Sequence, residues 1–487
     1  MEDTKNKGKS AMKVAVSILL VTWILLLLLL AAIYILRING YNNFAEWQNR
    51  KKVETTITPT SSPTPLPTST PTPEATEVLQ PTVTPTPEAT EVLQATVTPT
   101  PELSAVYTMK FSDNAGIDEK LRLQAEEIFG AEEEICYVSF TNGIYFSTVF
   151  QRGTEIYPVV YNLDTAEPVQ GSDLIKDIYF AIVKERLQTY IKETFPEEAE
   201  DEFTSYSQIY QAEDYQKFYL TQNELVFYFD AGTLSANHPA FTYACDLEEA
   251  KAFFKYHLDG TVNGPFIREL DPKAKMIAIT FDDGPYPKVE NQILELFEKY
   301  NGRTTFFFLG HRIEDWYEDM PKIAYDAGHE VASHTYSHEL NFATASVEEM
   351  WSEINRTNLA IAKSTGYAPD YVRFPGGSVG KQSLKIPMIN VNWNMDSIDY
   401  RYKNQEDGAE VIFNRLVKSM GNADGGVVLL HSIYQNSYDG VEKFLEYLAE
   451  RDYELVTLSE LFYYKGVTPK HGVVYVDGKG RLSDKIK

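Results

Sequence analysis

Cysteine is scarce in this 487-residue sequence, which contains only Cys136 and Cys245. Two cysteines exclude a Cys-rich zinc site and a dense disulfide framework, and they leave open either one bridge or two free thiols. Basic residues are also in the minority, because 44 Lys and Arg face 70 Asp and Glu and give a formal net charge of −26. A nucleic-acid partner requires clustered Lys and Arg, so this balance argues against one. The sequence also lacks a glycine-rich phosphate loop and a dinucleotide-binding fingerprint.

One long hydrophobic run, residues 14–36, lies near the amino terminus. About 23 apolar residues at a rise of about 1.5 Å span the roughly 30 Å hydrocarbon core of a membrane, so the run predicts one transmembrane helix. Residues 1–13 contain four lysines and are expected to stay in the cytoplasm as a short tail. A cleaved signal peptide has a shorter apolar region of about 7–15 residues. We therefore favour a single-pass anchor in the cell membrane, with the rest of the chain extracellular.

Residues 37–103 are expected to form an extracellular stalk. From about Thr55 to Leu103 the composition is dominated by Thr, Pro, Ser, Glu and Ala, and the unit Thr-Pro-Thr-Pro-Glu-Ala-Thr-Glu-Val-Leu-Gln begins at Thr70 and again at Thr84. No unit carries enough apolar surface to fold, so this segment predicts a disordered linker. Alternating proline keeps such a chain extended at about 3.1 Å per residue, so about 50 residues reach on the order of 150 Å. Such a tether suits an extracellular domain that faces and reaches into a cell wall or another polymer layer, and a passive stalk is the alternative.

Residues 104–264 are expected to form a mixed α+β domain. Its predicted helix runs from Ser172 to about Glu193, with an apolar stripe at helical spacing. The predicted strands are 135–141, 144–150, 157–162, 217–220 and 225–229.

Three phrases in this domain resemble a known module. They are Asn-Gly-Ile-Tyr-Phe-Ser from Asn142, Tyr-Asn-Leu-Asp-Thr from Tyr161 and Leu-Val-Phe-Tyr-Phe from Leu225. They are similar to the domain shared by lysozyme-sensing anti-sigma factors and some cell-wall deacetylases. The resemblance implies lysozyme or glycan binding as a role for the domain, and we find no catalytic constellation in it.

Residues 265–466 alternate short apolar runs with amphipathic helix patterns, which indicates a parallel β/α barrel or a doubly wound sheet. The predicted strands are 277–281, 305–309, 330–333, 371–374, 388–393, 427–430 and 455–458, and the predicted helices are 289–300, 320–327, 347–364, 409–420 and 441–451. Residues 467–487 are left as a C-terminal tail. In a barrel the carboxyl ends of the strands converge on one mouth, so chemistry is expected in the residues that follow each run.

Two adjacent carboxylates, Asp282 and Asp283, end the first run, which reads Met-Ile-Ala-Ile-Thr-Phe-Asp-Asp-Gly-Pro. Neighbouring side chains in a strand point to opposite faces, so the pair can share one site only where the strand stops and the chain turns. Such a turn presents a metal ligand beside a base, and a solvated Asp-Asp-Gly-Pro turn is the alternative.

A second group, Ser-His-Thr-Tyr-Ser-His, contains His334 and His338. Two histidines four residues apart present their imidazoles on one side of a helical turn, which suits one metal ion. With Asp283 they supply two nitrogens and one oxygen, a ligand set that leaves zinc an open position for water. Cobalt, manganese or nickel fit nearly as well, so zinc is a preference. An exposed helix that happens to carry two histidines is the alternative.

Further polar residues follow the later runs. Arg373 can form a fork onto Asp282 and hold it ionised as a general base. His431, after the run 427–430, is a candidate general acid whose ring is fixed by a carboxylate, with Asp399 as the first choice for that carboxylate and Asp396 as the second.

These groups together closely resemble the polysaccharide deacetylases of carbohydrate esterase family 4, which share the NodB homology domain. The match lies between Pro265 and Phe462 and consists of Thr-Phe-Asp-Asp-Gly-Pro, Ser-His-Thr-x-x-His, Arg-x-Pro and Leu-x-His in that order. It implies an α/β fold, a distorted (β/α)7 barrel, and a metal-dependent hydrolase. The roles it implies are base for Asp282, holder of the base for Arg373, acid for His431 with Asp399 beside it, and metal ligands for Asp283, His334 and His338. The residues expected to bind substrate are Tyr286, through its backbone N–H, Pro375, Gly376, Trp393, Tyr400 and Leu429.

The activity that we expect is the removal of N-acetyl groups from a sugar. An anchored, wall-facing layout favours peptidoglycan N-acetylglucosamine or N-acetylmuramic acid of a Gram-positive bacterium as the substrate. Three positions depart from the common family pattern and alter the groove wall: Tyr400 replaces Trp, Ser432 replaces Asp, and Gly377 replaces a larger side chain. An O-acetyl esterase acting on xylan-like polysaccharide, chitin oligomers as substrate, and a lysozyme or glycan sensor with secondary catalysis are the alternatives.

Overall fold

The structure is a computed structural model, and it describes residues 102–104, 111–130, 135–195, 217–233, 238–421 and 424–483. The predicted cytoplasmic tail, transmembrane helix and linker repeats lie outside these residues. Within the described ranges, no helix has both the length and the apolar character that crossing a membrane requires. The chain divides into two compact units, Met1–Pro99 and Thr100–Lys487, and the second unit contains both predicted folded domains.

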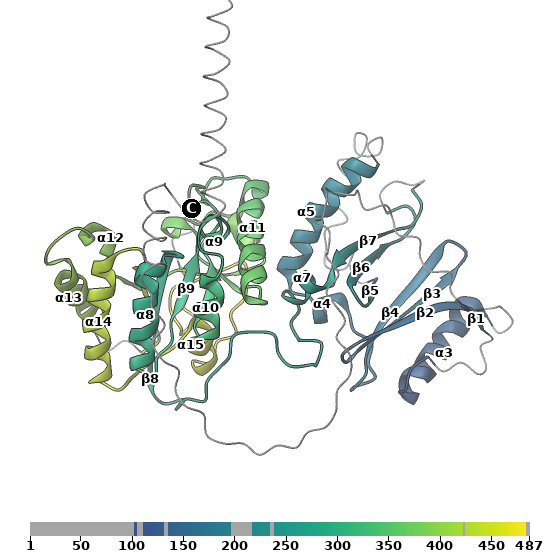
Figure 1. The fold of residues 1–487 in the computed structure, drawn as a ribbon, viewed down its shortest axis with the longest axis horizontal. Helices are drawn as coiled ribbons and strands as arrows, with labels where there is room; N and C mark the ends of the chain where they lie inside the picture. The colour runs from purple at the N-terminus through teal and green to yellow at the C-terminus, as the bar shows by residue number, and fades with distance from the viewer. Residues whose placement is uncertain are drawn as a thin grey trace, which may run out of the picture. The chain divides into compact units, whose positions relative to one another are not determined.

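The β/α domain is built on one parallel sheet with the strand order β13-β14-β8-β9-β10-β11-β12-β16, and β15 pairs with β8. Figure 1 labels its strands β8 and β9. The strands are β8 (Lys275–Gly284), β9 (Thr305–Phe308), β10 (Glu330–Ser333), β11 (Tyr371–Val372), β12 (Ile389–Val391), β13 (Met395–Asp396), β14 (Gly426–His431), β15 (Tyr453–Leu455) and β16 (Val474–Tyr475). The helices are α8 (Pro287–Lys299), α9 (Gly310–Asp315), α10 (Met320–Asp326), α11 (Val347–Thr365), α12 (Asp399–Tyr402), α13 (Gly408–Met420), α14 (Gln435–Ala449) and α15 (Leu458–Tyr464), with short 3₁₀ turns η4 (Pro375–Gly377) and η5 (Ser383–Lys385).

This topology confirms the predicted α/β class and the parallel sheet. The sheet is open, since its edge strands β13 and β16 are not paired with each other among the described residues. The predicted boundary at residue 466, after which only a C-terminal tail is expected, is partly wrong. Val474 and Tyr475 lie beyond it, and they form β16, which pairs with β12.

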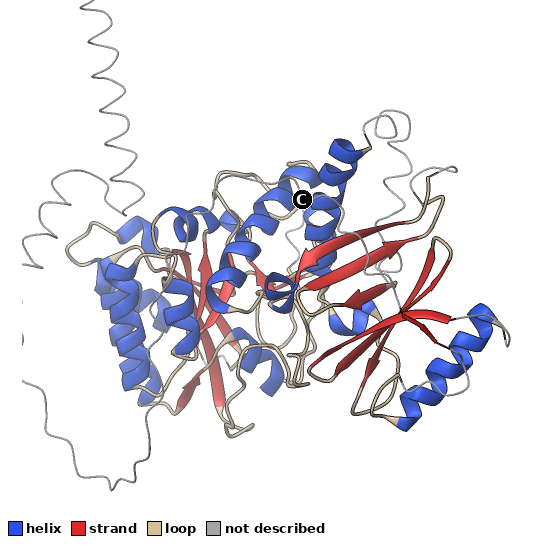
Figure 2. Ribbon diagram, turned by 45° about the vertical axis from the view of Figure 1, so that its right-hand side comes forward, coloured by secondary structure: helices blue, strands red, loops and turns tan. Residues whose placement is uncertain are grey.

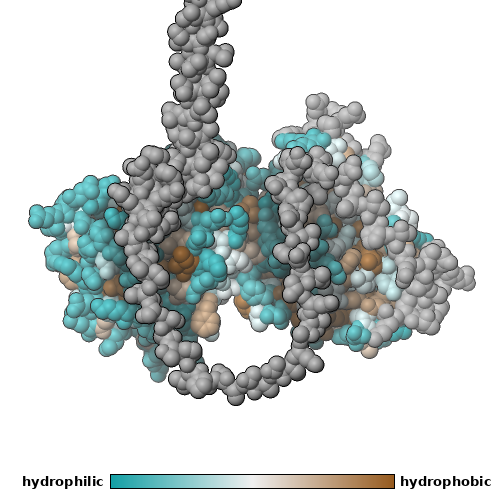
Figure 3. Space-filling model, in the orientation of Figure 1, coloured by the Kyte–Doolittle hydropathy of each residue, from teal (hydrophilic) through white to brown (hydrophobic). Residues whose placement is uncertain are grey.

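Both faces of the sheet are buried, as is usual for parallel strands. On β8, Ile277, Ile279 and Phe281 share a core with α8, α13 and α14. The alternate residues Met276 and Ala278 pack with α15 on the other face, and Figure 2 shows the strands lying between helices. The opposite faces of α13 and α14 are hydrophilic (Figure 3), in agreement with their amphipathic sequence patterns.

The α+β domain contains two antiparallel sheets, ordered β1-β2-β3-β4 and β5-β6-β7. The strands are β1 (Glu102–Ser104), β2 (Ile135–Asn142), β3 (Tyr145–Arg152), β4 (Glu155–Asn162), β5 (Phe218–Leu220), β6 (Glu224–Phe229) and β7 (Phe241–Asp246), and the helices are α3 (Ala115–Phe129), α4 (Gly171–Leu174), α5 (Asp177–Thr194) and α7 (Leu247–Lys251). Cys136 on β2 and Cys245 on β7 are both free thiols. Burial raises the pKa of Cys245 to about 12.

The helix predicted from Ser172 to Glu193 is wrong at its start, where the chain forms two helices, α4 and α5. Ile175 forms a β-bridge with Phe254, and the N–H of Lys176 donates to the Phe253 carbonyl. These contacts with a distant segment replace helical hydrogen bonds, so the break has no local signal.

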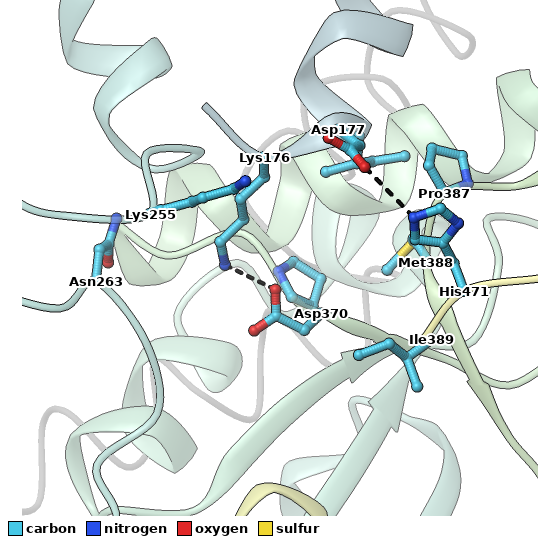
Figure 4. A pocket seen from close by; sticks show the side chains of 11 residues that line it. Lys176, Asp177, Lys255, Asn263, Asp370, Pro387, Met388, Ile389 and His471 are labelled. Carbon is cyan, nitrogen blue, oxygen red and sulfur yellow. Dashed lines mark ion pairs between the residues drawn. The ribbon is translucent and has the colours of Figure 1, made fainter. Parts of the chain in front are cut away.

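The start of α5 contacts the segment that leads into β11. Lys176 Nζ donates to the Ala368 carbonyl at 2.8 Å and lies 3.0 Å from Asp370 Oδ1. A cavity of about 300 Å³ lies beside this pair (Figure 4). His471 and Asp177 also line it, with His471 Nε2 3.4 Å from Asp177 Oδ2. Because residues just before β11 and β12 line it, this cavity is at the amino ends of the strands, where no catalytic residue is predicted.

Candidate active site at the carboxyl ends of the strands

The two carboxylates lie together, as predicted, but the expected end of the strand before them is wrong, because β8 continues through both of them to Gly284. The pairing of β8 with β9 is irregular between Phe281 and Gly284, and Asp283 has a left-handed φ of 70°. The turn brings both carboxylates to His334, whose Nε2 is 3.8 Å from Asp282 Oδ2 and 3.4 Å from Asp283 Oδ1.

The two histidines also meet, but the helical turn expected for them is wrong. Thr335 and His338 have left-handed φ values of 71° and 67°, and the intervening residues form an irregular loop after β10. Two backbone N–H groups of this loop donate to Glu353 Oε2 at 2.9 and 2.8 Å instead of forming helical bonds. The imidazole centroids of His334 and His338 are 5.2 Å apart.

The orientation of His334 suits a metal ligand. Its Nδ1 lies 2.8 Å from the Arg373 carbonyl, which can only accept, so Nδ1–H donates this hydrogen bond and Nε2 is the ring atom that is open to a metal ion. This Nε2 is the atom that faces Asp283.

The residues present fit a divalent cation. One donor atom from each of Asp283, His334 and His338 lies within 4.8 Å of the others, and no other such group of three occurs in the described part of the chain. Asp283 Oδ1 is buried and has no hydrogen-bond partner among the described residues. Burial raises the pKa of Asp283, but the neighbouring His334, His431 and His338 outweigh this effect and lower it well below its usual range. Two imidazole nitrogens and an ionised carboxylate are ligands that zinc and similar ions accept.

Arg373 contacts Asp282, as predicted, but through one hydrogen bond and not through the predicted fork. Arg373 is fully buried; its Nη1 donates to Asp282 Oδ1 and to Thr280 Oγ1, both at 2.7 Å, and its Nε donates to the Val391 carbonyl at 2.9 Å. The guanidinium also lies 4.1 Å from the ring centroid of Phe307. These contacts fix one oxygen of Asp282 and leave Oδ2 facing the metal-ligand group.

His431 lies on the other side of the metal-ligand group, with Nε2 4.0 Å from Asp283 Oδ2. Its Nδ1 is 2.7 Å from Asp399 Oδ1, the predicted carboxylate, and its backbone N–H donates to Asp399 Oδ2 at 2.7 Å. Burial lowers the pKa of His431, but Asp399 and the charges of Asp283 and Asp282 outweigh it and raise that pKa to about 9. The imidazole is therefore protonated at neutral pH and can give a proton away.

The predicted substrate-binding residues lie at or near this group. Tyr400 is exposed, and its ring centroid is 6.1 Å from that of His431. Trp393 is half-buried beside Arg373, Leu429 is buried two residues before His431, and η4 presents buried Pro375 followed by exposed Gly376.

The structure explains why position 377 is a glycine. Its φ is +65°, and a Cβ there would lie 3.0 Å from the ring of Trp393. A larger side chain at this position would displace the Trp393 ring, so the glycine and the tryptophan shape the groove wall together.

The expected role of the Tyr286 N–H is not available in this structure. This N–H donates to Glu290 Oε2 at 2.7 Å, and so it is not free to stabilise an oxyanion. Asp396, the second candidate for the carboxylate beside His431, does not contact that ring: its Oδ1 accepts from the N–H of Ile398 at 2.9 Å, and Asp399 takes the place beside His431.

Two residues at the site were missed from the sequence. Ser437 donates to Asp399 Oδ2 at 2.6 Å, and buried Glu290 contacts the turn after β8. Glu290 lies inside the predicted helix 289–300, in the first turn of α8, and Ser437 lies before the predicted helix 441–451, in the first turn of α14. Neither residue carries a signal that separates it from an ordinary polar residue.

The fold and the site indicate the class of this protein. It is a parallel α/β protein with a candidate metal-dependent hydrolase site at the carboxyl edge of its sheet. A family model described as "Polysaccharide deacetylase" matches residues 269–387. The peptidoglycan-N-acetylmuramic acid deacetylase PdaC of Bacillus subtilis (strain 168) is 37% identical over 193 residues, which cover 39% of this chain and 40% of that protein. A peptidoglycan-N-acetylglucosamine deacetylase of Bacillus cereus is 32% identical over 195 residues, which cover 38% of this chain and 68% of that protein. The solved structure of PdaC from Bacillus subtilis has 35% identity and a TM-score of 0.38 and covers 40% of this chain and 94% of that chain.

The chain therefore belongs to the polysaccharide deacetylase family. The matched segment spans less than half the length of the Bacillus subtilis relative.

Proposed function

We propose that this protein is a metal-dependent N-deacetylase of cell-wall peptidoglycan. The observation that carries the proposal is the convergence of three functional groups from separate strand ends. They are the metal-ligand group of Asp283, His334 and His338, the pair Asp282–Arg373, and the pair His431–Asp399.

Asp282 is the proposed general base. Arg373 occupies its Oδ1, and Oδ2 faces the place where an attacking water would lie between the base and the metal-ligand group. The buried guanidinium stabilises the ionised carboxylate and holds it in one orientation.

His431 is the proposed general acid. Its Nε2 faces the site and donates a proton to the leaving amine nitrogen, while Asp399 stabilises the imidazolium until the transfer. When bound at the ligand group, a divalent ion, with zinc preferred, supplies Lewis-acid activation of water and of the acetyl carbonyl.

Peptidoglycan is proposed as the substrate because both named relatives are peptidoglycan deacetylases, one for N-acetylmuramic acid and one for N-acetylglucosamine. The membrane anchor and long linker predicted from the sequence support an extracellular enzyme that reaches the wall from the cell membrane. Lysozyme or glycan binding by residues 104–264 remains part of this proposal as a separate role.

Acetate release tests the reaction and its bond type. The protein is incubated with zinc and, in parallel, with peptidoglycan, chitooligosaccharide and acetylxylan, and Asp282→Asn serves as the matched control. We expect acetate from peptidoglycan, and none from any substrate with the variant. Release from acetylxylan alone would identify an esterase and overturn the proposal.

A further inference from the structure

A buried carboxyl group, that of Glu290, lies directly behind the proposed site. Glu290 belongs to the first turn of α8, and its side chain is fully buried. Oε1 accepts from Ser432 Oγ at 2.6 Å, and Oε2 accepts from the Tyr286 N–H at 2.7 Å. Both donors are uncharged, so the carboxyl is held in the interior by neutral hydrogen bonds.

Glu290 touches the chain segments that carry the base and the acid. A Cβ on Gly284 would lie 2.0 Å from Glu290 Oε1, so the carboxyl rests against the backbone of the Asp-Asp-Gly turn. Ser432 follows the proposed acid His431, and its N–H donates to the Asp282 carbonyl at 3.1 Å. The end of β8, the start of α8 and the segment after β14 therefore meet at this carboxyl.

Burying a carboxyl between neutral donors costs free energy. Burial raises the pKa of Glu290 to about 7, although the hydrogen bonds from Ser432 and Tyr286 and the charge of Arg312 act to lower it. An apolar side chain would fill the same space without this cost, but it could accept a hydrogen bond from neither Ser432 nor Tyr286. The carboxyl is therefore suited to aligning these two segments.

We propose that Glu290 is a positioning residue that fixes the proposed acid His431 relative to the proposed base Asp282 by holding Ser432 and Tyr286. The inference rests on the proposed deacetylase reaction. Base and acid act on the same acetamide, and a displacement of about 1 Å in a catalytic group lowers turnover by about 100-fold.

The first arm of the test is Glu290→Gln, with Ser432→Ala as a second variant that removes only the hydroxyl donor. An amide at position 290 keeps the size of the side chain but can accept only one of the two hydrogen bonds, and its NH2 group can meet Ser432 Oγ only as a donor, which reverses that bond. We expect kcat for acetyl release to fall by about 100-fold in Glu290→Gln, with KM and zinc affinity unchanged. Ser432→Ala should lower kcat in the same direction.

Glu330→Gln is the matched control. Glu330 is also buried, is bonded by Thr305 Oγ1 and Ser459 Oγ, and has its pKa raised to about 7 by burial. Glu330 is the first residue of β10, so it lies at the amino end of its strand, whereas the candidate site lies at the carboxyl ends. This control should lower the melting temperature as Glu290→Gln does, while kcat stays at the wild-type value.

Rescue gives the third arm. In the Glu290→Gln background, Ser432→Asp offers the amide NH2 group a carboxylate acceptor in place of a hydroxyl that must turn to accept, and we expect kcat to recover at least in part.

The outcomes are distinct. Wild-type kcat in both Glu290→Gln and Ser432→Ala would overturn the positioning role, and so would an equal loss of kcat in Glu290→Gln and Glu330→Gln, which indicates general destabilisation. A metal-loaded wild-type protein that releases no acetyl group from any glycan overturns the proposed function, and the positioning role fails with it.

Discussion

Replacing Asp399 by Asn tests the proposed acid through a quantity that does not depend on turnover. The carboxylate of Asp399 is fully buried and accepts hydrogen bonds from His431 Nδ1 and N at 2.7 Å each, from Ser437 Oγ at 2.6 Å and from the Tyr400 N–H at 2.9 Å. The substitution keeps the size of the side chain and removes the charge that stabilises the imidazolium. We expect the pKa of His431 to fall from about 9 towards or below its ordinary value of 6.5.

The sign and size of the stability effect follow from linkage. Folding raises the pKa of His431, so protonated His431 stabilises the folded protein. This contribution to the free energy of unfolding is fully present below pH 6.5, the pKa of an ordinary histidine in the unfolded chain, and is lost as the pH rises through about 9. The difference between the folded and unfolded pKa values of His431 corresponds to about 3 kcal/mol in the free energy of unfolding, because each pKa unit is worth about 1.4 kcal/mol. Asp399→Asn should therefore lower the free energy of unfolding by up to about 3 kcal/mol more at about pH 6 than at about pH 10.

Urea unfolding of the metal-free protein, with a chelator present, measures this difference in wild type and variant. Asp396→Asn is the matched control, since Asp396 lies on a neighbouring strand and bonds the Ile398 N–H instead of His431. Its cost should be the same at both pH values. Equal costs of Asp399→Asn at both pH values would refute the assignment of His431 as an imidazolium stabilised by Asp399.

Three further substitutions separate the other roles. Asp282→Asn should lower deacetylation by about 10²–10⁴-fold while zinc stays bound, and full activity would contradict its role as base. His334→Ala should release the metal, which elemental analysis of the purified protein would reveal, and a full zinc content would disprove the ligand assignment. Arg373→Met leaves Asp282 buried without its cation, so we expect a loss of about 3–5 kcal/mol in the free energy of unfolding. A urea midpoint equal to that of the wild type would speak against that buried pair.

The site residues were predictable because parallel strands end at one edge of the sheet. Asp282, Arg373 and His431 each follow an apolar run, and the topology brings these run ends together. The pair His431–Asp399 also follows from this arrangement, since β13 lies next to β14 and Asp399 comes three residues after β13.

The parts that could not be predicted depend on contacts between distant segments. The loop from His334 to His338 takes left-handed φ values at Thr335 and His338 because Glu353, on α11, binds its backbone N–H groups. The same limit explains the unrecognised helix break at Lys176, which bonds to a carbonyl far along the chain. The commitment of the Tyr286 N–H to Glu290 is local, but a glutamate in an amphipathic helix carries no sign that it turns inward.

Other elements were missed for a different reason. Helix α3 and strand β7 have weak or mixed periodicity in the sequence, and they form because they pack against β3 and β6 respectively. Strand β16 is only two residues long, so its pairing with β12 has no pattern to reveal it.

Mass spectrometry of muropeptides tests the central claim most directly. Peptidoglycan is incubated with the zinc-loaded protein, digested, and compared with material treated with Asp282→Asn. We predict the loss of acetyl groups from N-acetylglucosamine or N-acetylmuramic acid with the wild type alone, and fragment ions identify which sugar is changed. Muropeptides that keep every acetyl group after treatment with the zinc-loaded wild type would contradict the account.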